Sequence, residues 1–197
     1  MRTESQEDLV FPWLRLLRVV VPSIFQSKVP LLTTTCVRLS GWPNDLDFNL
    51  HVNNGRYLAL ADIARIHWFI RTGMLAVARR HAAFPVVGDV IAKFRRDLRA
   101  FQSFEIHSRL IGWDTKWGFL EHRFVRSGRV VAVVAIRGVF KGPSGSIEPA
   151  VLLEGLAHTG PAPEMPEWAG HFHQSSDRLS DWVREEERVQ GLRGAQE

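Results

Sequence analysis

The sequence predicts an α+β domain in which a curved antiparallel sheet wraps around one long central helix. The first observation is a helical pattern over residues 54–72, where apolar side chains recur every three or four positions. The second is a change to a period of two near residue 84, which continues through four segments in succession. One helix followed by a run of strands is typical of antiparallel α+β domains and not of parallel sheets.

Composition fits one globular domain with terminal extensions. The chain has 197 residues, of which 45% are hydrophobic and 23% charged. The formal net charge is +4, but no nucleic-acid-binding motif accompanies it, and we expect no nucleic-acid partner. Cys36 is the only cysteine, which excludes an intrachain disulfide and favours a reducing cytoplasm. No metal-ligand constellation is recognised among the histidines.

Residues 1–28 are predicted to form an amphipathic helical extension. Residues 9–26 are mostly apolar, but Arg15 and Arg18 interrupt them. Acidic residues precede the apolar run, whereas a secretory signal peptide places basic residues there. Two interpretations stay open: a helix that packs on its own domain, or one that lies in a membrane interface. We therefore expect a cytoplasmic protein, with peripheral membrane contact through residues 9–26 in the second case.

The central domain is predicted to span residues 29–155. A β-branched, alternating segment from Leu31 predicts a first strand, which ends at the Gly-Trp-Pro-Asn turn of residues 41–44. The helix of residues 54–72 follows, and Gly73 is suited to end it. This helix is the expected centre of the domain.

Four alternating segments after the helix predict four consecutive strands. They cover residues 85–98, 103–114, 116–128 and 129–142. A Ser-Gly pair between the last two suits a tight hairpin. Strands that follow one another this closely pair antiparallel.

Residues 156–197 are predicted to be a Pro-rich linker followed by a short helix. Ser176 or Asp177 is suited to cap that helix, and its apolar stripe begins at Leu179. We expect the helix to dock on the domain or on a second subunit.

The polar stretch DLDFNLHVNNGRY directly precedes the long helix and holds the candidate site. Asp47, Asn49 and His51 alternate by two, so in an extended backbone their side chains would point to one side. The helix that begins near Asn54 offers unpaired N–H groups and a positive dipole end, which can stabilise an oxyanion. A carboxylate base beside an oxyanion site is what acyl transfer requires. The alternative is that Asp47, Asn53 and Asn54 only cap the helix and shape the turn.

This stretch resembles the signature loop of hotdog-fold acyl thioesterases. The pattern Asp-x-Asn-x-His-Val-Asn-Asn is similar to that of plant acyl-carrier-protein thioesterases, and the loop also resembles the 4-hydroxybenzoyl-CoA thioesterase family. The segments HVNNGRYLALADIAR, FEIHSRLIGWD and FLEHRFV resemble the thioesterase superfamily member six group, over residues 31–139. The sequence departs from the commonest pattern at Leu50, where many members have Gly, and the bulky residue is expected to narrow the pocket or shift the loop.

The resemblance implies a hotdog fold that hydrolyses an acyl-CoA or acyl-carrier-protein thioester. Coenzyme A enters as part of the substrate, and no cofactor or metal is implied. Asp47 is expected to act as general base or as nucleophile. Asn49 would orient Asp47 or water, and His51 would orient a partner or carry a proton. The backbone N–H groups of Asn54 and Gly55 would stabilise the oxyanion.

Further residues near the loop have two interpretations each. Tyr57 could hydrogen-bond within the site or be a core aromatic residue, and Asp62 could be a site acid or form a helical ion pair with Arg65. Asp97 follows an Arg-Arg pair, as a functional acidic residue does in the plant enzymes. Charge alone suggests three contacts for the phosphates of coenzyme A: Arg95, Arg96 and Arg99.

The chain is expected to be at least a homodimer. A single curved sheet leaves edge strands that must be covered, and the resemblance implies sheet-to-sheet pairing with active sites at the interface. The rival interpretation is a non-catalytic hotdog protein that holds acyl chains or lipid at a membrane. A dehydratase on the same fold is less favoured, because those enzymes place their His and acidic residue differently relative to the central helix.

Overall fold

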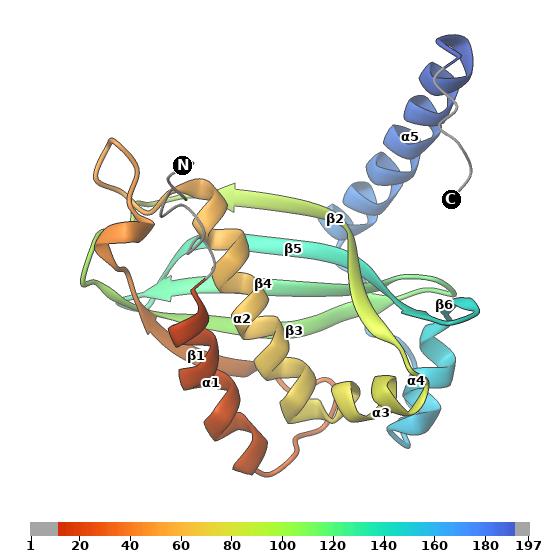
Figure 1. The fold of residues 1–197 in the computed structure, drawn as a ribbon, viewed down its shortest axis with the longest axis horizontal. Coiled ribbons are helices and arrows are strands. Elements are labelled where there is room, and N and C mark those ends of the chain that lie inside the picture. Colours follow the sequence, from red (N-terminus) through yellow and green to blue (C-terminus); the bar gives the residue numbers. More distant parts are fainter. Residues whose placement is uncertain (1–11, 192–197) are drawn as a thin grey trace, which may run out of the picture.

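The computed structural model describes residues 12–191 and consists of one curved sheet wrapped around a long helix (Figure 1). The sheet order is β1-β3-β4-β5-β2, with β6 paired to β5, and every pair is antiparallel. The strands are β1 (Thr35–Ser40), β2 (Phe84–Phe94), β3 (Ser103–Trp113), β4 (Gly118–Arg126), β5 (Arg129–Gly142) and β6 (Gly145–Ile147). The predicted antiparallel α+β architecture is confirmed.

The helices surround this sheet on both of its faces. They are α1 (Trp13–Phe25), α2 (Asn54–Thr72), α3 (Met74–Arg80), α4 (Pro149–Gly155) and α5 (Glu167–Val189). A 3₁₀ turn, η2 (Pro43–Asp45), precedes the candidate loop. For the described part of residues 9–26 the predicted N-terminal helix is confirmed; residues 9–11 lie outside the described range.

The central helix α2 has the predicted bounds, and local chemistry explains both ends. At its start, the side chain of Asn53 accepts a hydrogen bond from the backbone N–H of Gly55, which is an N-cap. At its end, Gly73 takes a left-handed conformation with φ of 82°, which glycine adopts without strain. Between them, Leu60, Ile63 and Ala64 are buried against the sheet.

The four strands predicted after α2 are confirmed, with one end corrected. Ser127 and Gly128 both have positive φ, as a tight hairpin between β4 and β5 requires. The first of the four ends at Phe94, four residues earlier than expected. The backbone N–H groups of Arg95 and Arg96 both donate to the carbonyl of Val131, so the chain turns away there.

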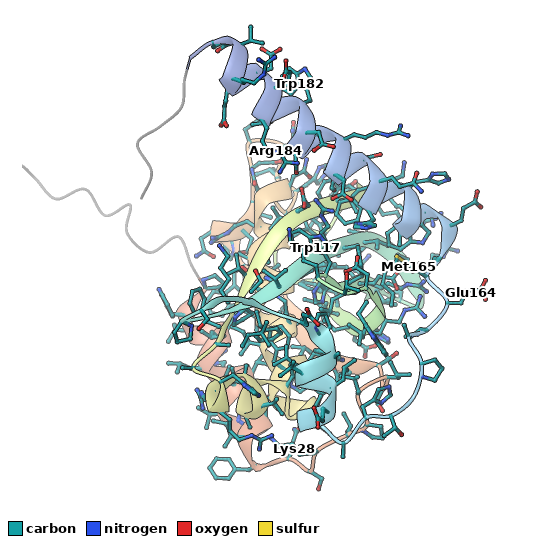
Figure 2. The ribbon with its side chains drawn as sticks, turned by 90° about the vertical axis from the view of Figure 1, so that its right-hand side faces the viewer. Lys28, Trp117, Glu164, Met165, Trp182 and Arg184 are labelled. Carbon is teal, nitrogen blue, oxygen red and sulfur yellow. The ribbon has the colours of Figure 1, made fainter. Side chains whose placement is uncertain are left out.

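The predicted C-terminal helix is present, but its predicted start and its cap at Ser176 or Asp177 are wrong. One helix, α5, begins at Glu167, so Ser176 and Asp177 lie inside it. Phe172 is buried, and Asp177 forms an ion pair with the buried Arg137 of β5 at 2.5 Å. These contacts hold α5 against the sheet. The helix begins within the segment that was predicted to be a linker. The C-terminal half, with Trp182 and Arg184, extends past the sheet (Figures 1 and 2).

The exposed edge of β2 carries apolar side chains. Phe84, Val87, Val90, Ile91 and Phe94 are all exposed. Among the described residues β2 pairs on one side only, with β5. An apolar edge of 11 residues is a surface on which a further strand can pair.

Candidate active site

The candidate loop is a tight turn, so the prediction that it is extended is wrong. Leu46 and Val52 form a β-bridge, and inside it the backbone N–H of Asp47 donates to the carbonyl of His51 at 2.9 Å. The N–H of Leu50 returns to the carbonyl of Asp47 at 3.0 Å. The turn pairs the backbone of Asp47 with that of His51. In a single extended strand the two residues would instead lie four positions apart along one face.

Leu50 makes this reversal with a positive φ of 60°. The left-handed region costs most non-glycine residues roughly 1–2 kcal/mol. The position is the one where the sequence departs from the glycine of many similar loops. The bulky side chain is 69% exposed, so at Leu50 the consequence of the departure is backbone strain.

The Asp47 carboxylate is held on one oxygen only. Its Oδ1 accepts the backbone N–H of Asn49 at 2.8 Å. Within residues 12–191 its Oδ2 has no hydrogen-bond partner. Asp47 does not cap α2, since Asn53 does. The structure therefore fixes the direction of this carboxylate and leaves one oxygen available.

The N-terminus of α2 offers fewer donors than the sequence suggested. The Gly55 N–H is engaged by the Asn53 side chain at 2.8 Å. Asn54 is the first residue of the helix, and its N–H has no acceptor within the helix. Of the two expected oxyanion donors, Asn54 is the one placed to serve without breaking a contact.

A second chain segment brings Asp97 to the loop. The His51 Nε2 lies 3.2 Å from an oxygen of Asp97, and the Val52 N–H donates to the carbonyl of Leu98 at 2.7 Å. His51 and Asp97 are both partly exposed. The structure thus joins the His51 imidazole to the Asp97 carboxylate beside the turn that carries Asp47.

The three arginines suggested for phosphate binding flank this acidic residue. Arg95, Arg96 and Arg99 are all exposed on the segment that carries Asp97. Arg96 reaches only a backbone carbonyl, that of Val130, at 3.5 Å. They form a basic surface beside the loop.

Tyr57 lies in the core beneath the loop. Its ring meets the rings of Phe94 and Phe124 edge-on, with centroids 5.1 and 5.0 Å away. Burial, and then the charge of Asp97, raise the pKa of Tyr57 to about 12. The phenol is neutral at pH 7, and Tyr57 supports the loop as a core aromatic residue.

Asp62 and Arg65 form an ion pair one turn apart on α2. Asp62 is eight residues beyond Asn54, which is roughly 12 Å along a helix. Both residues line a cavity of about 240 Å³ between α2 and the sheet. Asp47, Asn49 and His51 do not line it, so the structure does not bring Asp62 to the candidate loop.

Sequence reasoning missed the group that holds the loop in place. Asp45 is 1% exposed and binds Arg15 of α1 through both oxygens, at 3.0 and 2.6 Å. Its Oδ2 also accepts the N–H of Trp42, and Arg56 lies 3.3 Å from Oδ1. The sequence feature that could have indicated this ion pair is Arg15, a charged residue in the middle of a mostly apolar helix.

Two buried histidines sit away from the loop. His67 of α2 contacts the Ser23 hydroxyl of α1 at 2.7 Å, and burial lowers its pKa to about 4. His122 contacts Ser108 at 2.8 Å, and burial lowers its pKa to about 3. Both are neutral at pH 7 and act as packed polar groups of the core.

One cluster of metal-ligating residue types lies on β1 and β3. Ligand atoms of Cys36, Glu105 and His107 are all within 4.8 Å of one another. Arg38 donates to Glu105 at 2.6 Å, which places a cation where a metal ion would bind. The ion pair accounts for this cluster.

Comparison with known proteins identifies the class. The family model described as the Thioesterase-like superfamily matches residues 42–172, and the chain belongs to that family. The solved Escherichia coli YbaW probable thioesterase is 25% identical, with a TM-score of 0.55, and covers 61% of this chain and 90% of its own. The BH1999 gentisyl-coenzyme A thioesterase is 19% identical, with a TM-score of 0.52, and covers 63% and 100%. The fold is the hotdog fold.

Curated relatives show which group within the family this chain resembles. Protein THEM6 of Xenopus laevis is 35% identical over 150 residues, which are 75% of this chain and 70% of the relative. Protein THEM6 of Drosophila melanogaster is 31% identical over 162 residues, 79% and 82% of the two chains. The probable thioesterase YBR096W of Saccharomyces cerevisiae is 30% identical over 115 residues, 57% and 50%. The resemblance to the member-six group is confirmed.

Strain at Leu50 gives a stability prediction. We expect Leu50→Gly to raise the free energy of unfolding by up to about 1 kcal/mol. Glycine removes the steric cost of the left-handed backbone conformation, and the backbone entropy that glycine loses on folding offsets part of this gain. Urea unfolding followed by circular dichroism measures the change. Leu58→Gly, in the interior of α2, is the matched control and should lose about 1 kcal/mol. A loss of similar size at Leu50 would show that its backbone is unstrained.

Proposed function

We propose that the chain hydrolyses an acyl thioester with Asp47 as the catalytic carboxylate. The observation that carries the proposal is the turn of residues 47–51, which holds Asp47 on one oxygen, leaves the other available and lies at the start of α2. Membership of the thioesterase-like superfamily supports the reaction class. The substrate we propose is an acyl-CoA or acyl-carrier-protein thioester.

The chemistry requires little more than this arrangement. Asp47 takes a proton from water as the water oxygen adds to the thioester carbonyl carbon. The oxyanion that forms is stabilised by the Asn54 N–H and the positive end of α2. Its collapse breaks the carbon–sulfur bond and expels the thiolate, which takes up the proton. Direct attack by Asp47, through an anhydride that water then cleaves, uses the same carboxylate.

Neighbouring residues support the carboxylate in this scheme. His51, which lies 3.2 Å from an oxygen of Asp97, would carry the proton toward the thiolate. Asn49 contributes its backbone N–H, which keeps Asp47 oriented. The basic surface of Arg95, Arg96 and Arg99 would receive the phosphates of coenzyme A, as the coenzyme A substrate in the name of the BH1999 neighbour suggests.

Asp47→Asn tests the mechanism. The substitution keeps the size of the side chain but removes the basic oxygen. We expect kcat to fall by about 10² to 10⁴-fold with KM little changed. His51→Ala and Asn49→Ala should cost less. Thiol release from a panel of acyl-CoAs is the measurement, with melting temperatures as a fold control and the exposed Asp181→Asn as a matched carboxylate control. Full turnover by a folded Asp47→Asn variant would contradict the proposal.

We also propose that the protein is a homodimer paired along β2. The apolar side chains on this edge strand favour coverage by a second copy. A two-fold axis beside β2 would extend one sheet into the other and place the two α2 helices on the same face. Each candidate loop would then lie near the partner subunit, as the family resemblance implies.

Light scattering at low micromolar concentration tests the dimer. We expect twice the chain mass of 22.4 kDa. Val90→Lys with Ile91→Lys places charge on both faces of the edge strand and should give a monomer with little thioesterase activity. Leu179→Lys on α5 is the control and should leave both unchanged. A wild-type monomer with full activity would exclude a shared site.

A second candidate function is lipid association through α1, with or without turnover. One side of this helix is buried, where Ser23 meets His67 of α2 and Arg15 meets Asp45, yet the other side is also apolar. The large exposed apolar residues of α1 are Trp13, Leu14, Leu17, Val21, Ile24 and Phe25. The helix has no acidic residue, and Arg18 lies at the edge of this face. Among the described residues no helix is long and apolar enough to cross a membrane. We therefore propose that α1 contacts the surface of an anionic membrane.

Vesicle co-sedimentation tests the membrane contact. We expect the intact chain to bind vesicles that contain anionic phospholipid more strongly than neutral ones. Leu17→Glu with Ile24→Glu should weaken binding roughly tenfold or more, because two apolar side chains no longer insert. Leu179→Glu is the control, because Leu179 on α5 is as exposed as Leu17. Equal binding by the intact chain, the double variant and the control variant would show that α1 does not contact lipid.

A further inference from the structure

The cavity beside α2 has a mouth and a floor. Its lining residues that reach the surface include Asp62, Val87 and Lys116, which mark the mouth. Its most buried lining residues include Met74 of α3 and Leu152 of α4. The cavity therefore runs from the side of α2 near β2 to an end that the buried side chains of Met74 and Leu152 line.

The floor is built by close packing of α4 on α3. A side chain on Gly155 would lie 2.6 Å from a methyl group of Val77, so α4 approaches this closely only because the residue is glycine. Arg80 donates to the Gly155 carbonyl at 2.9 Å and holds the end of α4 in place. Leu152 and Leu153 are thereby fixed as a wall at this end of the cavity.

The interior is suited to an unsubstituted hydrocarbon. The charged lining groups, Asp62, Arg65 and Lys116, lie on the mouth side of the cavity. Among the deeper lining side chains the polar atom is the indole N–H of Trp68, which has no partner in the described structure and can only donate. A hydroxylated acyl group would bury an O–H without a side-chain acceptor, at a cost that a methylene chain avoids.

We propose that this cavity binds a straight aliphatic acyl chain and that Leu152 of α4 sets its maximum length. The proposal deepens the thioesterase function above, because the chain would be the acyl part of the thioester. Binding of the chain itself does not require Asp47. The mouth also carries the exposed Lys116, a cation suited to the carboxylate of a free fatty acid, whereas the cation of Arg65 is paired with Asp62. Burial lowers the pKa of Arg65 to about 10, so its guanidinium remains charged at pH 7.

Saturated fatty acids of increasing length are the probes, measured by displacement of a fluorescent fatty acid from the full chain. Each methylene that enters the cavity should tighten binding about four-fold. The gain should stop at one chain length, where the methyl end reaches Leu152. Leu152→Ala should move this limit to longer chains, and Leu152→Trp to shorter ones. Leu179→Ala, on the exposed face of α5, is the control and should leave the limit unchanged.

The same variants should shift the chain-length optimum of kcat/KM for acyl-CoAs in the same direction. Affinity that does not change with chain length, or a limit unmoved in both Leu152 variants while circular dichroism shows them folded, would overturn the proposal. Length-dependent fatty-acid binding that follows Leu152, without hydrolysis of any acyl-CoA, would support the cavity assignment and contradict the thioesterase function. The experiments can therefore reject the cavity assignment or the thioesterase function independently of each other.

Discussion

The burial of α2 by one curved sheet is the constraint on which the rest of the structure depends. A sheet can cover only one side of a helix, yet the buried residues of α2 include Tyr57 and Phe69, which meet rings of the sheet, and His67, which meets Ser23 of α1. Another side of α2 is covered by α1, which accounts for the apolar residues on the inner side of α1. Because α2 is fixed at both ends by Asn53 and Gly73, the loop before it is held at one edge of the domain.

The buried ion pair of Arg15 and Asp45 connects that loop to α1. Placing two charges out of water is costly, and the pair is stable because Asp45 also accepts the Trp42 N–H and lies near Arg56. Arg15 in turn stacks on the Trp42 ring at 4.2 Å. Removing Asp45 would leave the Arg15 charge buried without its counter-ion, and removing Arg15 would leave Asp45 with Arg56 alone, so the pair specifies one position for η2. It therefore orients the turn of Asp47 without touching it.

The sequence predicted those structural features that depend on residues close together in the chain. The bounds of α2 follow from Asn53 and Gly73, which act on their own neighbours, and the β4–β5 hairpin follows from its Ser-Gly pair. The contacts that define the site are not local: His51 meets Asp97 across 46 positions of sequence, and Asp45 meets Arg15 across 30. No period or motif encodes such pairs. The same reason applies to α5, whose Asp177 meets Arg137 of β5 across 40 positions of sequence.

The separation of loop and cavity along α2 carries the strongest consequence for function. The loop lies at the first turn of α2, and the mouth of the cavity lies near Asp62, roughly 12 Å further along the helix. A thioester carbonyl is directly bonded to the acyl chain, so it cannot lie at one position while its first methylene groups lie at the other. Pairing along β2 would resolve this, because the cavity adjoins β2 through Pro85 and Val87. A two-fold axis at this edge would run the two α2 helices in opposite directions and bring the Asp47 of one copy toward the cavity mouth of the other. The edge strand, the loop and the cavity would then form one site only in the assembled dimer.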